Sequence, residues 1–486
     1  MFLGIDVGTS EVKVLLLDED HRVIDTAGSA LDISRPHPGH SEQNPVDWWN
    51  ATCAALATLR ANHPAAYAAV RAIGLSGQMH GAVLLDAAER VLRPAILWND
   101  VRSDRECLDM MQELPALTQL AGSLAMPGFT APKLRWVRQH EPQVFAQVAK
   151  VLLPKDYVRL HLTGEYVCDM SDASGTMWLD VEQRAWSPAL LALGGLRESQ
   201  MPRLVEGSQA GGALRAEVAA TLGLPAGIVV AGGGGDNAAS AVGMGAVEAG
   251  EGFLSLGTSG VLFVVTPSYQ PNAASATHAF CHALPRRWHQ MSVMLSAASC
   301  LQWAAGALGL ESAAAVEAKA ASLPADARAH APLFLPYLSG ERTPHNDAHV
   351  RGSFHGLSHS TDQAALAYAV IEGVTFGLND GLRALQAAGS APRQLSLVGG
   401  GARSAFWAQQ LASSLDLDIV THPESAAGGA LGAARLGWLA TGASVAQVCR
   451  KPDIAHTYRS DPAEHAMLSA RFARFRALYP ALRKLA

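Results

Sequence analysis

The chain has 486 residues, of which 49% are hydrophobic and 16% charged, and its formal net charge is -6. This composition is typical of a globular protein rather than a disordered one, and it lacks the basic excess of a nucleic-acid-binding protein. The length exceeds what one hydrophobic core usually supports, so we expect two or three domains.

The segments near the start of the chain and the cysteine pattern bear on location. The first ten residues, MFLGIDVGTS, contain Asp6 and lack the basic start of a secretory signal. The chain also lacks a stretch of about 20 apolar residues that could cross a membrane as a helix. The six cysteines are scattered and form no C-x-x-C pair, which favours reduced thiols over disulfides. We therefore expect a cytoplasmic protein.

The first hundred residues alternate between strand and helix patterns. Residues 2–8 and 12–18 are apolar, β-branched runs joined by a short turn, which predicts a hairpin, and residues 21–31 could add a third strand. A helical pattern follows Asn44, with Pro45 at its first position. Residues 71–86 then predict a strand, a glycine-containing loop and another strand.

The second half of the chain repeats this order. Residues 251–265 predict a strand, a turn and a strand, and further predicted elements are a strand at 287–295, helices at 296–308 and 364–389, and a strand, glycine loop and helix over 394–415. A repeat of this length indicates duplicated domains rather than a solenoid. We expect a boundary within residues 243–252, giving domains 1–245 and 246–486, the second ending in a helical tail.

A Gly-Thr-Ser turn occurs once in each predicted domain, at residues 8–10 and at residues 257–259. Glycine lets the backbone approach a ligand closely, and the hydroxyls of Thr9, Ser10 and Thr258 add to free N–H groups, a combination that suits phosphate oxygens. One such turn alone is commonly only a hairpin loop. Two such turns at equivalent places in the two domains favour a nucleotide bound between the domains. Gly257 and Thr258 would then contact it from one side, and Thr9 and Ser10 from the other.

Two acidic residues follow buried strands. Asp6 ends the first strand, where a carboxylate is costly unless it binds a cation such as Mg²⁺ or caps the turn. Asp236 follows the four glycines 232–235 and opens a helix, so it stands where a base could meet a substrate, although a helix cap would look the same. Lys13 either reaches a phosphate or faces solvent.

Other loops add candidate contacts. Gly399, Gly400 and Gly401 join a strand to a helix, which suits close approach of a nucleotide or tight strand–helix packing. Neither G-x-G-x-x-G nor G-x-x-x-x-G-K-[ST] occurs. Met79 and His80 lie in a loop that suits a polar substrate. A zinc site at His278, Cys281 and His282 is disfavoured, because a fourth ligand at suitable spacing is missing.

Together, the segments GIDVGTSEVK, GGGGDN, LSLGTSG, SGERTPH and LVGGGARS resemble the FGGY family of carbohydrate kinases, and residues 128–140 and 352–372 are similar to that family's two signatures. The resemblance runs from residue 2 to about residue 440. It implies an α/β fold of two duplicated ribonuclease-H-like, actin-type domains, with ATP and Mg²⁺ in the cleft between them.

The resemblance also implies residue roles. Asp236 would be the general base and Asp6 would hold Mg²⁺, with Asp236 beside it. Met79, His80, Asp236 and Asn237 would bind the sugar. The nucleotide would contact Thr9, Ser10, Lys13, Gly257, Thr258, Gly399, Gly400 and Gly401. Glu11 stands where the family commonly has glycine, and its charge puts the affinity for ATP in question.

The segments GQMHG, LWND, LPKDY, MSDASGTMW and FCHALP are similar to those of family members that phosphorylate D-xylulose at its 5-hydroxyl. Family members acting on gluconate, ribulose or glycerol are the first alternative. An actin-like ATPase is the second, and a catalytically silent regulator the third. A homodimer is a further suggestion of the resemblance.

Overall fold

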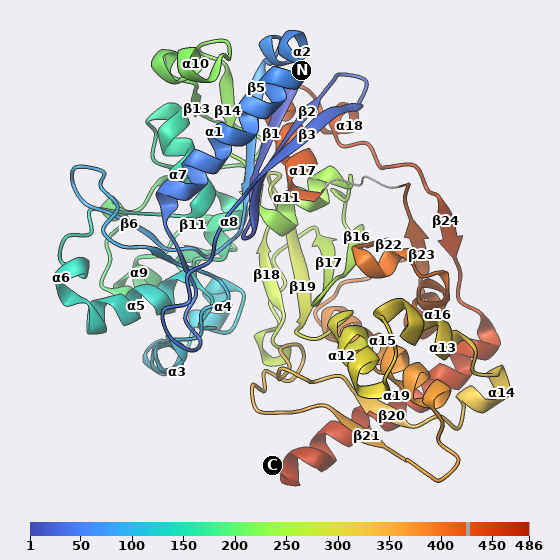
Figure 1. The fold of residues 1–486 in the computed structure, drawn as a ribbon. Helices are drawn as coiled ribbons and strands as arrows, with labels where there is room; N and C mark the ends of the chain where they lie inside the picture. The colour runs from blue at the N-terminus through green and yellow to red at the C-terminus, as the bar shows by residue number, and fades with distance from the viewer. Residues whose placement is uncertain (424–427, 486) are drawn as a thin grey trace.

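The computed structural model describes residues 1–423 and 428–485. Two seven-stranded mixed sheets form its centre, one built from each half of the chain (Figure 1). The first contains, in spatial order, β13 (Ala210–Ala213), β14 (Val229–Ala231), β5 (Ala72–Gly77), β1 (Phe2–Val7), β2 (Glu11–Leu17) and β3 (Val23–Ala30), with β15 (Gly234–Gly235) beside β5. The second contains β18 (His278–Cys281), β19 (Trp288–Met294), β17 (Gly260–Thr266), β16 (Gly252–Leu256), β22 (Gln394–Val398), β23 (Asp418–Thr421) and β24 (His456–Tyr458).

The two sheets share a central arrangement, an antiparallel meander of three strands followed by two parallel strands. In the first, β1, β2 and β3 form an antiparallel meander, β5 and β14 follow parallel to β1, and β13 closes the edge antiparallel. In the second, β16, β17 and β19 form the meander, β22 and β23 are the parallel strands, and β24 is the antiparallel edge. The predicted hairpins are confirmed, and so is the duplication of the fold.

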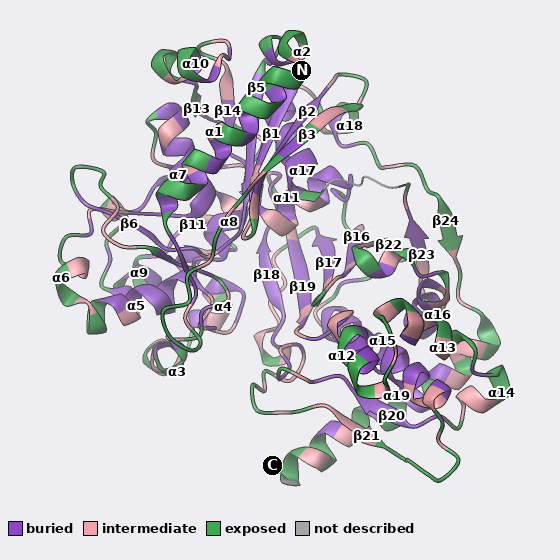
Figure 2. Ribbon diagram, in the orientation of Figure 1, coloured by how far each residue is buried: buried purple, intermediate pink, exposed green. Residues whose placement is uncertain are grey.

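Helices cover the first sheet because each presents an apolar face to it. α1 (Pro45–Asn62) begins as predicted: the Asn44 side chain accepts a hydrogen bond from the Val46 amide, and Pro45 takes the first position. Its buried residues, Trp48 among them, pack beside β2 and β3, while its outer face is exposed (Figure 2). α7 (Pro154–Thr163) lies beside α1.

One helix from the second half of the sequence packs on the first sheet. α17 (Gly428–Leu439) contacts β1, β5 and α11 (Asp236–Gly243), and its residues from Gly429 onward are buried. The backbones approach so closely that a Cβ at Gly74 would lie 1.7 Å from the carbonyl oxygen of Ala433. A Cβ at Gly432 would lie 1.7 Å from the carbonyl oxygen of Ala239. Glycine at these positions is what lets the helix dock.

Several helices of the second half pack around α15 (Gln363–Ala387), which is buried over most of its length. Its neighbours are α12 (Ser299–Leu308), α13 (Ala313–Ala321), α16 (Ala405–Leu415) and α19 (Pro462–Leu482). α19, the predicted helical tail, is part of this core, because buried Arg471 forms an ion pair with Glu372 of α15 at 2.6 Å. Across the described ranges, no helix combines the length and apolarity needed to cross a membrane.

Candidate active site

The candidate site forms where the parallel strands of the first sheet end. β1 and β5 run parallel with Asp6 opposite Ser76, and β15 places Gly235 opposite Gly77. Because parallel strands end at the same edge of a sheet, Asp6 at the end of β1 and Asp236 directly after β15 come together. The sheet thus unites two carboxylates that are 230 positions apart (236 minus 6).

The two carboxylates affect one another. Burial, with a contribution from the charge of Asp6, raises the pKa of Asp236 to about 6. Burial also raises the pKa of Asp6, whereas the Ser76 side chain and the charge of Lys13 lower it. Asp236 Oδ1 accepts hydrogen bonds from the backbone and side-chain nitrogens of Asn237, at 2.7 and 2.9 Å. With a pKa of about 6, the Asp236 side chain is mostly a carboxylate at neutral pH.

The surroundings of Asp6 suit a divalent cation. Its Oδ1 atom is buried and, among the residues that the structure describes, has no hydrogen-bond partner. A Cβ at Gly429, the second residue of α17, would lie 2.7 Å from both Asp6 carboxylate oxygens. An unpaired buried carboxylate oxygen beside a second carboxylate is a poor arrangement without a cation, and oxygen ligands of this kind are those that Mg²⁺ takes.

No larger metal cluster is found in the described ranges: no group of three or more His, Cys, Asp or Glu side chains there is arranged to hold a metal ion. Two carboxylates are nevertheless enough for Mg²⁺, which usually completes its coordination shell with water and substrate phosphates.

Met79 and His80 lie beside this pair. The Met79 side chain lies close to two glycines. A Cβ added to Gly235 would lie 2.9 Å from Met79 Sδ, and a Cβ added to Gly175 would lie 2.7 Å from Met79 Cε. His80 has a positive φ of 72°, and its Nδ1 lies 2.7 Å from the carbonyl oxygen of Gly175. Burial and the charge of Lys133 lower the pKa of His80 to about 3, so the imidazole is neutral. A neutral imidazole can exchange hydrogen bonds with a sugar hydroxyl.

The second half of the chain contributes to this side of the site. The ring of Phe129 packs against His80 at a centroid distance of 4.5 Å and against His278 of β18 at 5.6 Å. His278 Nδ1 lies 2.8 Å from the hydroxyl of Ser123. The sequence raised His278 only for a disfavoured zinc site and did not single out Phe129, since the contact between them depends on the packing of two distant segments.

The first Gly-Thr-Ser turn is held by side-chain hydrogen bonds. The Thr9 hydroxyl donates to Gln78 Oε1 at 2.9 Å and accepts from Trp98 Nε1 at 3.0 Å. Lys13 stands opposite Asp6 in the strand register, and its ammonium lies 3.1 Å from the Glu11 carboxylate. Ser10 is exposed. The turn therefore lies at the same edge as Asp6, with Glu11 directed to Lys13.

The second Gly-Thr-Ser turn and the second glycine loop form a separate group at the end of β16. The amides of Ala297 and Ala298 donate to the carbonyl oxygens of Thr258 and Gly257, at 2.9 and 2.8 Å. Gly399 has a φ of 89°, and its Cβ would lie 2.8 Å from the carbonyl oxygen of Leu256. A Cβ at Gly401 would lie 2.4 Å from the Leu256 side chain. Gly399 and Gly401 thus pack closely against Leu256, while Gly399 and Gly400 are exposed. Contact of this loop with a nucleotide stays a prediction.

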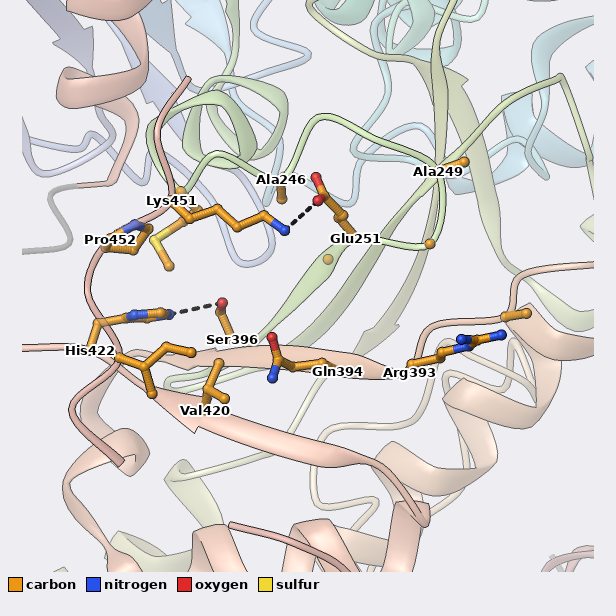
Figure 3. Close-up of a pocket in the computed structure, with 15 residues that line it drawn as sticks. Ala246, Ala249, Glu251, Arg393, Gln394, Ser396, Val420, His422, Lys451 and Pro452 are labelled. Atoms are coloured by element: carbon orange, nitrogen blue, oxygen red, sulfur yellow. Dashed lines mark hydrogen bonds and ion pairs between the residues drawn. The ribbon is translucent and has the colours of Figure 1, made fainter. Parts of the chain in front are cut away.

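A cavity of about 460 Å³ lies elsewhere, between the second sheet and two segments outside it, residues 244–251 and 451–454 (Figure 3). Glu251 and Lys451 form an ion pair across it at 2.5 Å, and His422 Nε2 lies 2.9 Å from the Ser396 hydroxyl. Neither carboxylate of the candidate site lines this cavity. This cavity is therefore separate from the strand ends at which Asp6 and Asp236 lie.

Comparison with known proteins identifies the family. Residues 1–243 match the N-terminal domain of the FGGY family of carbohydrate kinases, and residues 252–441 match its C-terminal domain. The chain belongs to the FGGY family. The expected fold class, two duplicated α/β domains of the actin-like ATPase type, is thereby confirmed for this FGGY kinase.

Full-length relatives of this FGGY kinase are known. It is 50% identical over 486 residues to the xylulose kinase of Escherichia coli strain K12, covering 99% of each chain. The crystal structure of a xyloylose kinase from Brucella ovis superposes with a TM-score of 0.97 at 53% identity, covering 100% of both chains. A gluconate kinase from Lactobacillus acidophilus gives a TM-score of 0.92 at 26% identity, covering 99% of this chain and 97% of that one. The fold is therefore shared by kinases of different sugars.

Proposed function

We propose that the protein is a xylulose kinase, which transfers the γ-phosphoryl group of ATP to the 5-hydroxyl of D-xylulose. The observation that carries this proposal is the 50% identity to the Escherichia coli xylulose kinase over 99% of both chains. The site is compatible with this activity, because the carboxylates of Asp236 and Asp6 and the neutral imidazole of His80 lie at the same edge of the first sheet.

Asp236 is the general base in this proposal. Its pKa of about 6 keeps it deprotonated at neutral pH while leaving it basic enough to accept the proton of the attacking hydroxyl. Asn237 orients the carboxylate by holding Oδ1, and these hydrogen bonds do not involve Oδ2. Met79 and His80 would hold the sugar beside it.

Asp6, with Asp236, would hold Mg²⁺. When bound, the ion would neutralise charge on the phosphates, which is the main requirement of phosphoryl transfer. Thr9, Ser10 and Lys13 would face the phosphates from the first half of the chain. Gly257, Thr258 and the loop of Gly399, Gly400 and Gly401 would face the nucleotide from the second half.

The division into a sugar-binding domain 1–245 and a nucleotide-binding domain 246–486 belongs to the same proposal. So do a cytoplasmic location, where ATP is available, and a homodimer. Light scattering on the purified protein would measure the assembly.

The decisive assay measures ADP formation with Mg-ATP and each of D-xylulose, L-ribulose, gluconate and glycerol. We expect D-xylulose to give the highest kcat/KM. Asp236→Asn should lower kcat by about 10²-fold to 10⁴-fold, the usual effect of losing a general base. A higher kcat/KM with another sugar would refute the substrate assignment, and near-natural turnover by a folded Asp236→Asn variant would refute the base.

A further inference from the structure

A buried charge cluster lies behind the candidate site. The Lys155 ammonium of α7 is 2.6 Å from Asp156, 2.9 Å from Asp169 and 2.9 Å from Asp172, and all four side chains are fully buried. Burial acts to lower the pKa of Lys155, but the three carboxylates raise it well above its ordinary value. Burying one cation with three acids is not a favourable way to gain stability. What the cluster holds in place is therefore of interest.

The cluster fixes the start of α8 (Met170–Ser174). Asp169, the residue before this helix, accepts hydrogen bonds from the Ser171 amide at 2.7 Å and the Asp172 amide at 3.3 Å. The Ser171 hydroxyl also donates to Asp169. With Asp169 bound to Lys155, the position of the Ser171 hydroxyl is determined by charged, buried partners.

Ser171 connects this cluster to the proposed base. The Ser171 hydroxyl donates a hydrogen bond to Asp169, and its oxygen accepts one from the Gly235 amide at 3.1 Å. Gly235 directly precedes Asp236 and is the residue before α11. A short chain of contacts, from Lys155 through Asp169 and Ser171 to Gly235, thus ends at the backbone that carries the Asp236 side chain.

The same short helix touches the other parts of the site. The carbonyl oxygen of Gly175, directly after α8, bonds to His80, and the Ser174 hydroxyl accepts from the Cys281 amide of β18 at 3.1 Å. α7 contributes a second buried cation, since Arg159 donates to the carbonyl oxygens of Ala231 and Gly232 ahead of Asp236. The glycine loop has few side chains to hold it, so these contacts supply its rigidity.

We propose that Ser171, anchored by Asp169 and Lys155, is a positioning residue that orients Asp236 through the Gly235 amide. This inference rests on the proposed function, in which Asp236 is the base. A glycine loop without such support would let the carboxylate move, and a displacement of about 1 Å at a reacting group can cost about 100-fold in rate.

Ser171→Ala is the variant that tests this inference. Removing Lys155 would leave three buried carboxylates without their cation and unfold the region. Ser171→Ala removes only the bridging hydroxyl, because the amide of residue 171 still caps α8 on Asp169. Ser187→Ala is the matched control. Ser187 is also buried, and its side chain caps α9 (Pro188–Gly194) without contacting Asp236.

We expect Ser171→Ala to lower kcat by about 10-fold to 100-fold, with the KM for ATP within about twofold and an unchanged circular dichroism spectrum. Ser187→Ala should keep the natural kcat. In a double-mutant cycle, adding Ser171→Ala to Asp236→Asn should cause no further loss, because a residue that acts through the base has nothing left to orient.

Two outcomes would overturn the inference: natural kcat in Ser171→Ala, or an equal loss in the presence and absence of the Asp236 carboxylate. Either can occur while Asp236→Asn alone shows its expected loss of kcat of about 10²-fold to 10⁴-fold, which would leave the proposed base intact. Conversely, an active Asp236→Asn variant would refute the base directly, so the two failures are distinguishable.

Discussion

At the scale of single residues, the protein places costly groups close together at one edge of a sheet. Asp6 has a buried oxygen without a partner among the described residues, and the pKa of Asp236 is raised to about 6. The glycines around them, such as Gly235 and Gly429, leave space that side chains would fill. Such a concentration of unfavourable features is typical of functional sites rather than of stabilising ones.

Glu11 permits a prediction about ATP affinity. Its carboxylate pairs with the Lys13 ammonium at 3.1 Å, and Lys13 stands opposite Asp6 in the register of β1 and β2. Glu11 would therefore compete with a phosphate of ATP for Lys13. Both side chains are about half exposed, and exposed pairs contribute at most about 1 kcal/mol. Glu11→Gln should therefore lower the KM for ATP by no more than about fivefold. Steady-state kinetics would check this, and a higher KM would contradict it.

Glu341 permits a prediction about stability and pH. Burial raises the pKa of Glu341 to about 8, while the amides of Leu295 and Arg342 act against the shift. The folded protein thus keeps this proton up to about pH 8, whereas the unfolded chain releases it near the ordinary value of 4.5. Because the folded state binds more protons between these values, this residue makes stability fall as pH rises from about 4.5 to about 8.

Glu341→Gln removes this dependence. Its gain in unfolding free energy over the natural chain should be larger at pH 8.5 than at pH 5.5 by roughly 3 kcal/mol, since the loss of stability between these pH values spans a little more than two pKa units at about 1.4 kcal/mol each. Denaturant unfolding at the two pH values is the measurement. The exposed Glu311→Gln serves as the control, and an equal gain at both pH values would show that Glu341 is ionised in the folded state.

At the scale of elements, close backbone contact between α17 and the first sheet is the unusual feature. The sequence of α17, with glycine and alanine along much of its length, indicates an apolar helix but does not indicate which surface the helix packs against. The partner is the face of β1 and β5 where Gly4 and Gly74 expose the backbone. Small residues on both surfaces are what bring the N-terminus of α17 beside Asp6.

Gly74→Ala should prevent this docking. The new Cβ would meet the carbonyl oxygen of Ala433 at 1.7 Å, so backbone must move. We expect a loss of about 3 kcal/mol or more in the free energy of unfolding. Gly306→Ala in α12 is the matched control, because a Cβ there meets nothing within 4 Å, and it should stabilise the protein by about 0.5–1 kcal/mol. Comparable stability of the two variants in denaturant would contradict the prediction.

At the scale of the whole molecule, the two halves of the sequence are interlocked. α17 of the second half is buried on the first sheet, and β18 bonds to α8 of the first half through Cys281 and Ser174. The first half alone would therefore expose the surface that α17 covers. Cooperativity between the halves is the expected consequence.

Differential scanning calorimetry tests this interlocking. We expect one unfolding transition of the full chain, with equal calorimetric and van't Hoff enthalpies. The fragment of residues 1–245 should fail to give a cooperative transition of its own, because it lacks α17. Two separate transitions in the full chain, or a stable fragment, would show that the contact with α17 contributes little.

The sequence by itself determined the repeated elements and the candidate carboxylates. Strands, turns and caps depend on neighbouring residues, so the two hairpins and the cap at Asn44 could be predicted locally. The duplicated Gly-Thr-Ser turns indicated the repeated fold, and the position of Asp6 and Asp236 after apolar runs indicated a site. For Gly399 and Gly401 the sequence left two explanations open; the structure shows both glycines packed against Leu256, and their contact with a nucleotide stays a prediction.

Only the tertiary structure decided which distant segments meet at the site. It placed Gly429 against Asp6, Phe129 between His80 and His278, and Ser171 under Gly235. These pairs are separated by tens to hundreds of residues, and no local pattern encodes them. They follow from the close fit of helices on the sheets, which depends on the shapes of all the packed surfaces together rather than on any one segment.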